Sequence, residues 1–392
     1  MLKRTFLGKW TFKTAYSTIL EIRGVRFVSQ DASDSKPEAI QEPSATESSC
    51  NTLQKRSQMH LVRALEDDTQ RRPAIDPKET SIVLFPGQGA QYVGMAAKLM
   101  RFPGARSIFD LANQVLGYDL LKICVEGPRE KLSRTEYAQL AVMVSSLAAL
   151  EQLREERPRS IETCVATAGF SLGEITALVF AGALPFDKAV RLVQIRANAM
   201  QAACDTVPSG MALILYGPET KVGAACKKAE QWCLERGVES PYCGVANYIY
   251  PHCKVIAGHQ EALQYIEVNA KALHIKRMKR LQVNGAFHTP IMQSAVEPFA
   301  NALKKIYISD PLIRVYSNVD GKTYRNATHI LRQLPKQIVS PVRWEQSMHL
   351  MYERQQGTDF PRTFECGPGK GLKQVLEKVN AKAANTAFNV EA

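Results

Sequence analysis

The chain has 392 residues, of which 45% are hydrophobic and 22% charged, so it is large enough for two folding units or one core with a sizeable insertion. No apolar run reaches the roughly 18 residues that span a bilayer, and nine cysteines without a C-x-x-C pair argue against a disulfide scaffold or a zinc site. The net charge of +12 is not accompanied by a recognised nucleic-acid-binding module, so we expect neither nucleic-acid binding nor membrane insertion.

The first 29 residues are strongly basic. Glu21 is their one acidic residue, and their basic residues are Lys3, Arg4, Lys9, Lys13, Arg23 and Arg26. A basic, acid-poor start with interspersed Leu, Phe and Trp predicts a mitochondrial transit peptide at residues 1–29 and a location in the mitochondrial matrix. A solvated basic tail is the alternative. A secretory signal is disfavoured because Lys9 and Lys13 interrupt its apolar segment.

Two further segments precede the folded body. Residues 30–57 are rich in Ser, Glu, Asp, Pro and Gln, which predicts a disordered spacer that cannot bury a core. Residues 58–79 hold apolar residues at Leu61, Val62 and Leu65, enough for a short helix, and then become a turn-rich connector. We expect the globular body to begin at the end of this connector.

Strands and helices alternate in the next part of the chain. An apolar run at residues 81–85 predicts a buried strand that ends at Pro86-Gly87, and a helix follows that loop. Residues 137–154 have the apolar spacing of a helix, and residues 164–168 form a β-prone run before Gly169. This alternation predicts a parallel α/β sheet.

The order of elements changes between residues 209 and 283. The predicted elements are a strand at 211–216, a helix at 219–236, strands at 242–247 and 254–257, a helix at 261–273 and a strand at 276–283. The order βαββαβ is typical of a ferredoxin-like unit. We therefore expect a ferredoxin-like subdomain at residues 209–283, inserted into a discontinuous large α/β domain at residues 80–208 and 284–385.

A G-x-S-x-G motif, Gly169-Phe170-Ser171-Leu172-Gly173, lies between a predicted strand and a helix predicted at residues 174–181. This placement indicates a hydrolase-like parallel-sheet domain in which a tight turn exposes the Ser171 hydroxyl as a nucleophile. The start of the helix would supply unpaired N–H groups to a developing oxyanion. The alternative is a structural serine in a glycine-rich turn.

A nucleophilic serine needs a base, and the chain has seven histidines. His288 is the best candidate, because it follows a predicted strand in a loop whose Gly285 and Pro290 restrict the backbone. The alternatives near turns are His252, His259 and His329. The glycine-rich loop at residues 85–91 lacks both the Lys-Ser/Thr of a P-loop and G-x-G-x-x-G spacing, which disfavours a nucleotide fold.

Several motifs occur in the order found in one enzyme family. They are Phe85-Pro86-Gly87-Gln88-Gly89-Ala90-Gln91, Gly169-Phe170-Ser171-Leu172-Gly173-Glu174, Val193-Gln194-Ile195-Arg196, Gly285-Ala286-Phe287-His288-Thr289, Gln337-Ile338-Val339-Ser340-Pro341-Val342-Arg343-Trp344 and Glu365-Cys366-Gly367-Pro368-Gly369. Over about residues 80–378 the chain resembles the malonyl-CoA:acyl carrier protein transacylases and the acyltransferase domains of fatty acid and polyketide synthases.

The resemblance implies catalytic roles for five positions. Ser171 matches the acylated nucleophile, and His288 matches its general base. Gln337 matches the residue whose main-chain oxygen orients the histidine. The backbone N–H groups of Gln88 and Leu172 match the oxyanion hole.

The resemblance also implies which residues choose the acyl group. Arg196 matches the arginine that holds the free malonyl carboxylate, and a buried guanidinium fork would be left unpaired by a simple acyl chain. Without the resemblance, a solvated helix face would be the preferred interpretation of Arg196. Phe287 is similar to the aromatic residue of malonyl-selective members. Phe170 stands where many members have histidine, and we expect both rings to line the acyl group.

The implied reaction transfers a malonyl group from malonyl-CoA to the phosphopantetheine thiol of acyl carrier protein through a malonyl-serine intermediate, which would supply mitochondrial fatty acid synthesis. It requires no metal and no cofactor, and we expect a monomer. A basic cluster upstream of His288 is a candidate docking site for the acidic carrier and coenzyme A, or only a solvated face. Its members are Lys276, Arg277, Lys279 and Arg280.

Two rival functions stay open. A serine thioesterase or hydrolase would use the same turn, but it should have an acidic third member after the serine and has no need of Arg196. A non-catalytic scaffold of a mitochondrial synthase assembly would tolerate the loss of Ser171. The joint presence of Ser171, His288, Arg196 and Gln337 argues against the scaffold.

Overall fold

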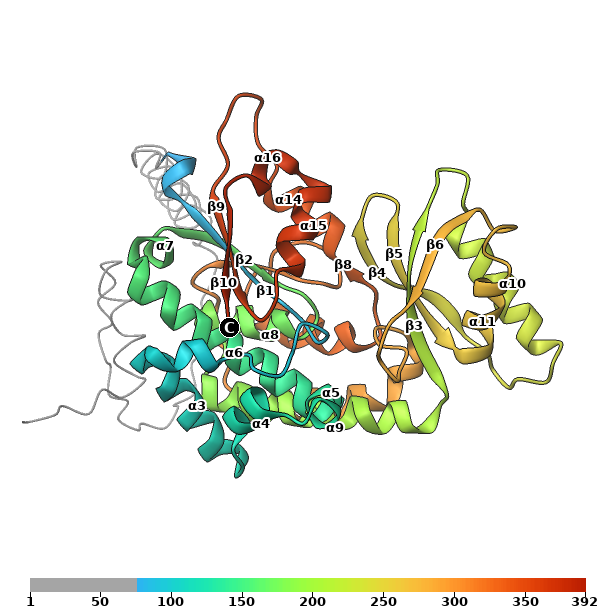
Figure 1. Ribbon diagram of the computed structural model, residues 1–392, viewed down its shortest axis with the longest axis horizontal. Coiled ribbons are helices and arrows are strands. Elements are labelled where there is room, and N and C mark those ends of the chain that lie inside the picture. The colour runs from blue at the N-terminus through green and yellow to red at the C-terminus, as the bar shows by residue number, and fades with distance from the viewer. Residues whose placement is uncertain (1–75) are drawn as a thin grey trace, which may run out of the picture. The chain divides into compact units, whose positions relative to one another are not determined.

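The computed structural model describes residues 76–392. The predicted transit peptide at residues 1–29, the spacer at 30–57 and the short helix near residues 61–65 lie outside the described residues. From Pro77 onward the chain forms one compact unit. Its strands make two five-stranded sheets (Figure 1).

One sheet, which belongs to the large α/β domain, is parallel throughout. Its strands, in spatial order, are β10 (Ala387–Glu391), β9 (Arg362–Gly367), β1 (Ser81–Phe85), β2 (Cys164–Gly169) and β7 (Arg314–Tyr316). β1 lies in the centre with every residue buried, which explains why its sequence is a continuous apolar run. β1 and β2 confirm the strands predicted at residues 81–85 and 164–168.

Helices cover both sides of this sheet (Figure 1). One group contains α3 (Pro103–Leu116), α6 (Thr135–Glu156) and α9 (Phe186–Thr206), and the other contains α14 (Trp344–Met351), α15 (Gly371–Val379) and α16 (Ala381–Ala384). α6 confirms the helix predicted at residues 137–154, and most of it is buried because α3, α9 and β9 surround it. The shorter helical segments are η1 (Pro77–Glu79), η2 (Ala97–Arg101), α4 (Leu120–Glu126), α5 (Arg129–Ser133), α7 (Pro158–Glu162), η3 (Pro290–Ala295), α12 (Val296–Lys304), α13 (Ala327–Gln333) and η4 (Leu334–Ile338).

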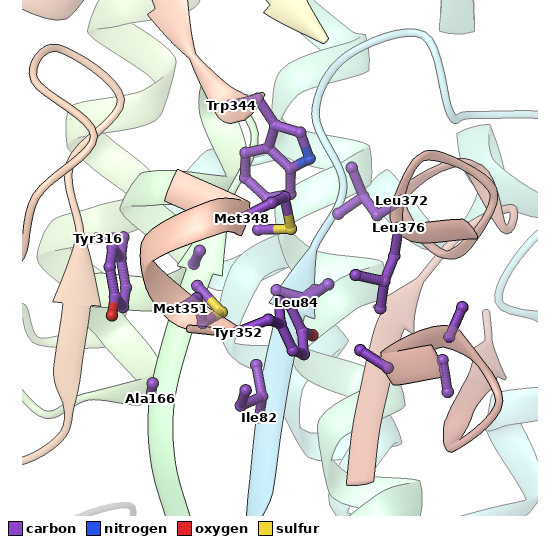
Figure 2. Packing of buried hydrophobic residues seen from close by; sticks show 14 of the residues in the cluster. Ile82, Leu84, Ala166, Tyr316, Trp344, Met348, Met351, Tyr352, Leu372 and Leu376 are labelled. Carbon is purple, nitrogen blue, oxygen red and sulfur yellow. The ribbon is translucent and has the colours of Figure 1, made fainter. Parts of the chain in front are cut away.

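An apolar cluster joins the sheet to α14 and α15 (Figure 2). Leu84 of β1, Trp344 and Met348 of α14, and Leu376 of α15 are members of this cluster, and each is fully buried. Burying a large apolar side chain stabilises a fold by about 1.5–3 kcal/mol. Trp344 also packs edge-on against Phe170, with ring centroids 5.4 Å apart, so the packing extends to the G-x-S-x-G turn.

The other sheet belongs to the predicted ferredoxin-like unit. Its strands, in spatial order, are β6 (Ile275–Arg280), β3 (Ser209–Tyr216), β5 (Cys253–His259), β4 (Cys243–Tyr250) and β8 (Val342–Arg343). α10 (Val222–Leu234) and α11 (Gln260–Val268) pack against it through their own apolar cluster. The chain order βαββαβ and the antiparallel pairing of its four strands confirm the predicted fold.

Four strands were not predicted, namely β7, β8, β9 and β10. β10 pairs with β9 through Glu391, so the expected end of the large domain at residue 385 is too early. A five-residue edge strand with only Ala387 and Val390 buried has too weak an apolar pattern to recognise. β8 has two residues and adds a parallel strand beside β4. The boundaries at residues 209 and 283 stay a prediction, because the chain from Pro77 onward is one compact unit.

Candidate active site

The G-x-S-x-G turn lies where two central strands end. β1 and β2 are parallel neighbours, and Phe85 at the end of β1 is in register with Gly169 at the end of β2. The carboxyl ends of parallel strands meet at one edge of a sheet, so the glycine-rich loop after Phe85 lies beside the turn that holds Ser171. The N–H of Phe170 donates to the Phe85 carbonyl oxygen over 3.0 Å. α8 (Leu172–Phe180) begins directly after Ser171.

Ser171 adopts a strained backbone conformation that the motif's glycines permit. Its φ of 51° and ψ of −105° cost a non-glycine residue about 1–3 kcal/mol. A Cβ atom on Gly173 would lie 2.3 Å from the carbonyl oxygen of Phe85. A Cβ atom on Gly169 would lie 1.8 Å from the carbonyl carbon of Gly173. The two glycines therefore allow strand, turn and helix to approach closely.

Asn318 also holds this turn, which the sequence pattern did not indicate. Its Oδ1 accepts a hydrogen bond from the N–H of Ser171 over 2.6 Å, and its Nδ2 donates to the carbonyl oxygen of Gly169 over 2.9 Å. Asn318 is 1% exposed and follows β7, the neighbour of β2 in the sheet. The side chain thus bridges both sides of the strained residue.

His288 is the histidine that lies beside Ser171. Its Nε2 is 2.7 Å from the Ser171 Oγ, and its Nδ1 is 2.7 Å from the main-chain oxygen of Gln337 in η4. The other candidates, His252, His259 and His329, contact Tyr216, Tyr242 and Tyr324 respectively. A carbonyl oxygen only accepts, so Nδ1 carries the proton and Nε2 is left to accept the proton of the serine hydroxyl.

The environment of His288 favours its neutral form. Burial, and secondly the positive charge of Arg196, lower the pKa of His288 to about 4, although the hydrogen bond to Gln337 acts in the opposite direction. A neutral imidazole is the form that can accept a proton. His288 is therefore prepared to act as a base at neutral pH.

The pH dependence of Ser171 acylation tests this electrostatic environment. With acetyl-CoA, which has no carboxylate to interact with Arg196, single-turnover acylation should stay constant from pH 7 to pH 5 and fall to half near pH 4. A lowered pKa keeps the base neutral until the pH falls through the folded-state value. Intact-mass measurement of the acetyl adduct gives the rate, and circular dichroism at each pH verifies that the chain stays folded. A midpoint near 6.5, the usual histidine value, would contradict the assignment.

Two backbone N–H groups are available to a developing oxyanion. Among residues 76–392, no protein acceptor takes the N–H of Gln88 or of Leu172. Gln88 belongs to the loop after β1, and Leu172 is the first residue of α8. The N–H of Ser171 is occupied by Asn318, and the assignment of the oxyanion hole to Gln88 and Leu172 stays a prediction.

Arg196 is a buried cation whose partners are neutral. It lies on α9 and is 1% exposed. Its Nη1 donates to Gln139 Oε1 over 2.6 Å, and its Nη2 donates to Gln337 Oε1 over 2.7 Å and to Ser171 Oγ over 3.2 Å. Burial lowers the pKa of Arg196 to about 10, so the guanidinium stays charged at neutral pH. Within the described part of the chain no carboxylate forms a salt bridge with it, and a buried cation of this kind favours an anionic ligand beside Ser171.

The Gln337 side chain connects Arg196 to a buried carboxylate. Its Nε2 donates to Glu174 Oε2 over 2.5 Å and to the main-chain oxygen of Ser171 over 2.8 Å. Glu174 also accepts from the Tyr324 hydroxyl over 2.6 Å. Burial raises the pKa of Glu174 to about 7, against the effect of its hydrogen bonds and of Arg196. Glu174 belongs to a motif in the sequence, but neither its role nor that of Tyr324 could be inferred from it.

The two aromatic residues expected to line the acyl group lie in different environments. Phe287 is 7% exposed and directly precedes His288. Phe170 is half-buried and packs against Trp344, as described above. Both flank the serine–histidine pair in sequence, and their role in acyl selection stays a prediction.

The basic cluster does not form one continuous patch. β6 is an edge strand of the sheet that belongs to the ferredoxin-like unit, and it exposes Lys276, Arg277 and Lys279. Arg280 is half-buried, and its guanidinium is hydrogen-bonded to Gln260 and 4.0 Å from Glu267. Because side chains alternate along a strand, Arg277 and Lys279 share one face and Arg280 lies on the other.

The segment after β6 reaches the active-site loops. Gln282, Val283 and Asn284 line a cavity of about 430 Å³ together with Gln88, and the other lining residues include Arg134 at the start of α6. The exposed cations of β6 are therefore only a few positions along the chain from the residues that line this cavity. A larger cavity of about 830 Å³, walled by the loop at residues 353–360, includes none of the candidate site residues.

No cluster of three or more His, Cys, Asp or Glu side chains suited to a metal ion occurs in residues 76–392. In the same residues no helix is both long and apolar enough to cross a membrane.

Comparison with known proteins places this geometry in a family. Residues 82–359 match the family described as acyl transferase domain. The chain is 72% identical over 347 residues to a Drosophila melanogaster protein named probable malonyl-CoA-acyl carrier protein transacylase, mitochondrial, a match covering 88% of this chain and 92% of that one. It is 49% identical over 315 residues to the mitochondrial malonyl-CoA-acyl carrier protein transacylase of Homo sapiens, covering 80% of each chain.

Solved structures agree with the sequence comparison. The structure of the malonyl CoA-acyl carrier protein transacylase from Coxiella burnetii matches with a TM-score of 0.72 and 31% sequence identity. The match covers 81% of this chain and 95% of that protein.

Proposed function

The chain belongs to the acyl transferase domain family, and from that premise we propose that it transfers a malonyl group from malonyl-CoA to the phosphopantetheine thiol of acyl carrier protein. It is an acyltransferase that supplies mitochondrial fatty acid synthesis. The protein is mitochondrial, and the basic composition of residues 1–29 supports a transit peptide and a location in the matrix.

The observation that carries the proposal is the buried guanidinium of Arg196 beside the nucleophile. Its Nη2 lies 3.2 Å from Ser171 Oγ, so an acyl group on that oxygen extends from a point adjacent to a positive charge. A malonyl ester has a free carboxylate, which a guanidinium fork binds through two parallel hydrogen bonds. An acetyl group would leave this cation without an anion, which accounts for a preference for malonyl.

The first half of the reaction forms an ester on the protein. Ser171 Oγ attacks the thioester carbonyl of malonyl-CoA while His288 Nε2 accepts its proton. The main-chain oxygen of Gln337 holds the imidazole and stabilises the imidazolium that forms. The N–H groups of Gln88 and Leu172 stabilise the tetrahedral oxyanion. Its collapse breaks the carbon–sulfur bond, and His288 returns the proton to the coenzyme A thiolate.

The second half repeats the chemistry with the carrier. His288 removes the proton of the phosphopantetheine thiol, the sulfur attacks the malonyl-serine carbonyl, and the carbon–oxygen bond to Ser171 breaks. The proton then returns to Ser171 Oγ. Each step is balanced by the groups present, so we propose that neither a metal nor another cofactor takes part. Phe170 and Phe287 would exclude water from the ester during the exchange of thiols.

The exposed cations near the opening support a docking role. Lys276, Arg277 and Lys279 are free to attract acidic groups of the carrier or the phosphates of coenzyme A. Arg280 is a weaker candidate, because it is half-buried and already bonded to Gln260. We propose that the protein acts as a monomer, since all the proposed catalytic groups come from one chain.

A transfer assay with the full chain tests the function. The protein is mixed with malonyl-CoA, then with carrier protein bearing phosphopantetheine, and both proteins are followed by intact mass. We expect a malonyl ester on the enzyme that disappears as malonyl carrier forms, with little free malonate. Release of malonate to water at the same rate with and without carrier would favour a hydrolase. A folded chain that forms no adduct would favour a scaffold.

A further inference from the structure

Glu174 is buried in the active site, although the proposed reaction does not use it. It is 0% exposed on the first turn of α8, three residues after the nucleophile. Its carboxylate receives hydrogen bonds from the Tyr324 hydroxyl, the Gln337 Nε2 and the backbone N–H of Asn318. Placing a carboxylate in a fully buried site is costly unless donors surround it, and here donors do.

The orientation of the Gln337 amide follows from these partners. Its Nε2 faces two oxygens that accept, one from Glu174 and one from the Ser171 main chain. Its Oε1 must then point the other way, where it accepts from Arg196 Nη2. A rotation of the amide by half a turn would set Nε2 against the guanidinium, donor against donor. Glu174 therefore selects one of the two possible amide orientations.

The same arrangement keeps the guanidinium of Arg196 available. A carboxylate in direct contact with Arg196 would occupy the N–H groups that a substrate carboxylate needs. Glu174 acts across the Gln337 amide instead, as a hydrogen-bond acceptor that forms no salt bridge with Arg196. Apart from Ser171 Oγ itself, the remaining anchor is Gln139, which contacts only Nη1, and the Arg196 Nε has no partner among the described residues. One anchor alone would leave the guanidinium free to swing.

We propose that Glu174 is a positioning residue that acts through the Gln337 side chain to hold the Arg196 guanidinium toward Ser171, and so sets the selectivity for acyl groups that carry a carboxylate. This inference rests on the proposed function. It assigns Glu174 no contact with substrate and no proton transfer. Its consequence is specific, because malonyl transfer depends on the Arg196 orientation and acetyl transfer does not.

Replacement of the carboxylate by an apolar side chain of similar length tests the inference. In the full-length Glu174→Met variant we expect malonylation of Ser171 to slow by about 10- to 100-fold, the size expected when a charged hydrogen-bond partner is lost, while acetylation slows less than about 3-fold. Glu174→Gln keeps one oxygen that can accept from Gln337 Nε2 and should recover most of the malonyl rate. Single-turnover intact-mass measurement with malonyl-CoA and acetyl-CoA gives both rates.

Glu365 supplies a matched control. It is 1% exposed on β9, its pKa is raised by burial to about 7, and it accepts from the backbone N–H groups of Leu372 and Lys373 at the start of α15. Glu365→Met removes an equally buried carboxylate away from the reacting groups. It should lower the unfolding temperature without changing the ratio of malonyl to acetyl rates.

A second variant keeps the test decisive if Glu174→Met does not fold. Gln337→Met retains the main-chain oxygen that orients His288 and removes every hydrogen bond of the side chain, including the one to the Ser171 main chain. Its readout is the ratio of malonyl to acetyl rates, which should fall as in Glu174→Met, and combining it with Glu174→Gln should lower that ratio no further. An equal fall in both rates, or an unchanged ratio in a folded variant, overturns the inference. A wild-type chain that forms no malonyl adduct refutes the proposed function instead.

Discussion

Ser171→Ala is expected to abolish the malonyl adduct and to lower malonyl transfer by at least about 10³-fold. The reaction requires an oxygen that can become an ester, and Ser171 Oγ is the hydroxyl that lies 2.7 Å from the buried neutral imidazole of His288. Alanine removes that oxygen, and no neighbouring group in the site can replace it as the ester. The measurement is the mass of the enzyme after malonyl-CoA and the rate of malonyl-carrier formation.

Ser347→Ala is the control for loss of a buried serine. Ser347 is 1% exposed on α14, and its Oγ donates to the carbonyl oxygen of Arg343 over 3.1 Å. This variant should form the adduct at the wild-type rate. A malonyl adduct that persists in Ser171→Ala, mapped by peptide mass to another residue, would show that the nucleophile is elsewhere.

Arg196→Ala is expected to reverse the acyl selectivity. Removing one partner of a buried ion pair costs about 3–5 kcal/mol, which corresponds to a fall of roughly 10²- to 10⁴-fold in malonyl transfer. Acetyl transfer should rise or stay level, because the variant no longer buries a cation that acetyl cannot pair. Arg196→Lys should give an intermediate malonyl rate, since an ammonium keeps the charge but not the two-pronged fork.

Arg191→Ala provides the comparison on the same helix. Arg191 is exposed on α9, and its Nη1 donates to the Gln194 side-chain oxygen over 3.2 Å. It should leave the ratio of malonyl to acetyl rates unchanged. Parallel loss of both activities in Arg196→Ala would mean that Arg196 supports the fold of the site rather than the choice of substrate.

Local patterns were sufficient to predict much of the fold. The apolar run of β1, the helical spacing of α6 and the order of elements in the ferredoxin-like unit each appear as a pattern in consecutive residues. An element buried on one side shows a periodic pattern of apolar residues, and a strand buried on both sides shows a continuous apolar run, so both can be recognised in the sequence. β7, β8 and β10 were missed because two to five residues at the edge of a sheet are too few to show a period. β9 was matched only through a family motif and was not predicted as a strand.

The site was predictable where chemistry is concentrated in a short motif. Gly169 and Gly173 indicate a close approach of backbone segments, since a Cβ atom on either would collide with a neighbouring backbone. His288 was the best candidate among several loop histidines, and the family resemblance then matched it to the general base. Asn318 and Tyr324 left no signal, because each meets the turn or Glu174 from a distant segment through one or two hydrogen bonds.

The sequence by itself determined the elements, the nucleophilic turn and the class of fold, because these follow from local periodicity and from residues adjacent in the chain. Only the tertiary structure brought His288 to Ser171 across 117 positions and turned the Gln337 side chain between Arg196 and Glu174. A hydrogen bond between distant side chains depends on distances set by the packing of whole elements. The order of residues does not give these distances, so the hydrogen bonds and pKa shifts of the site can be determined only from the folded chain.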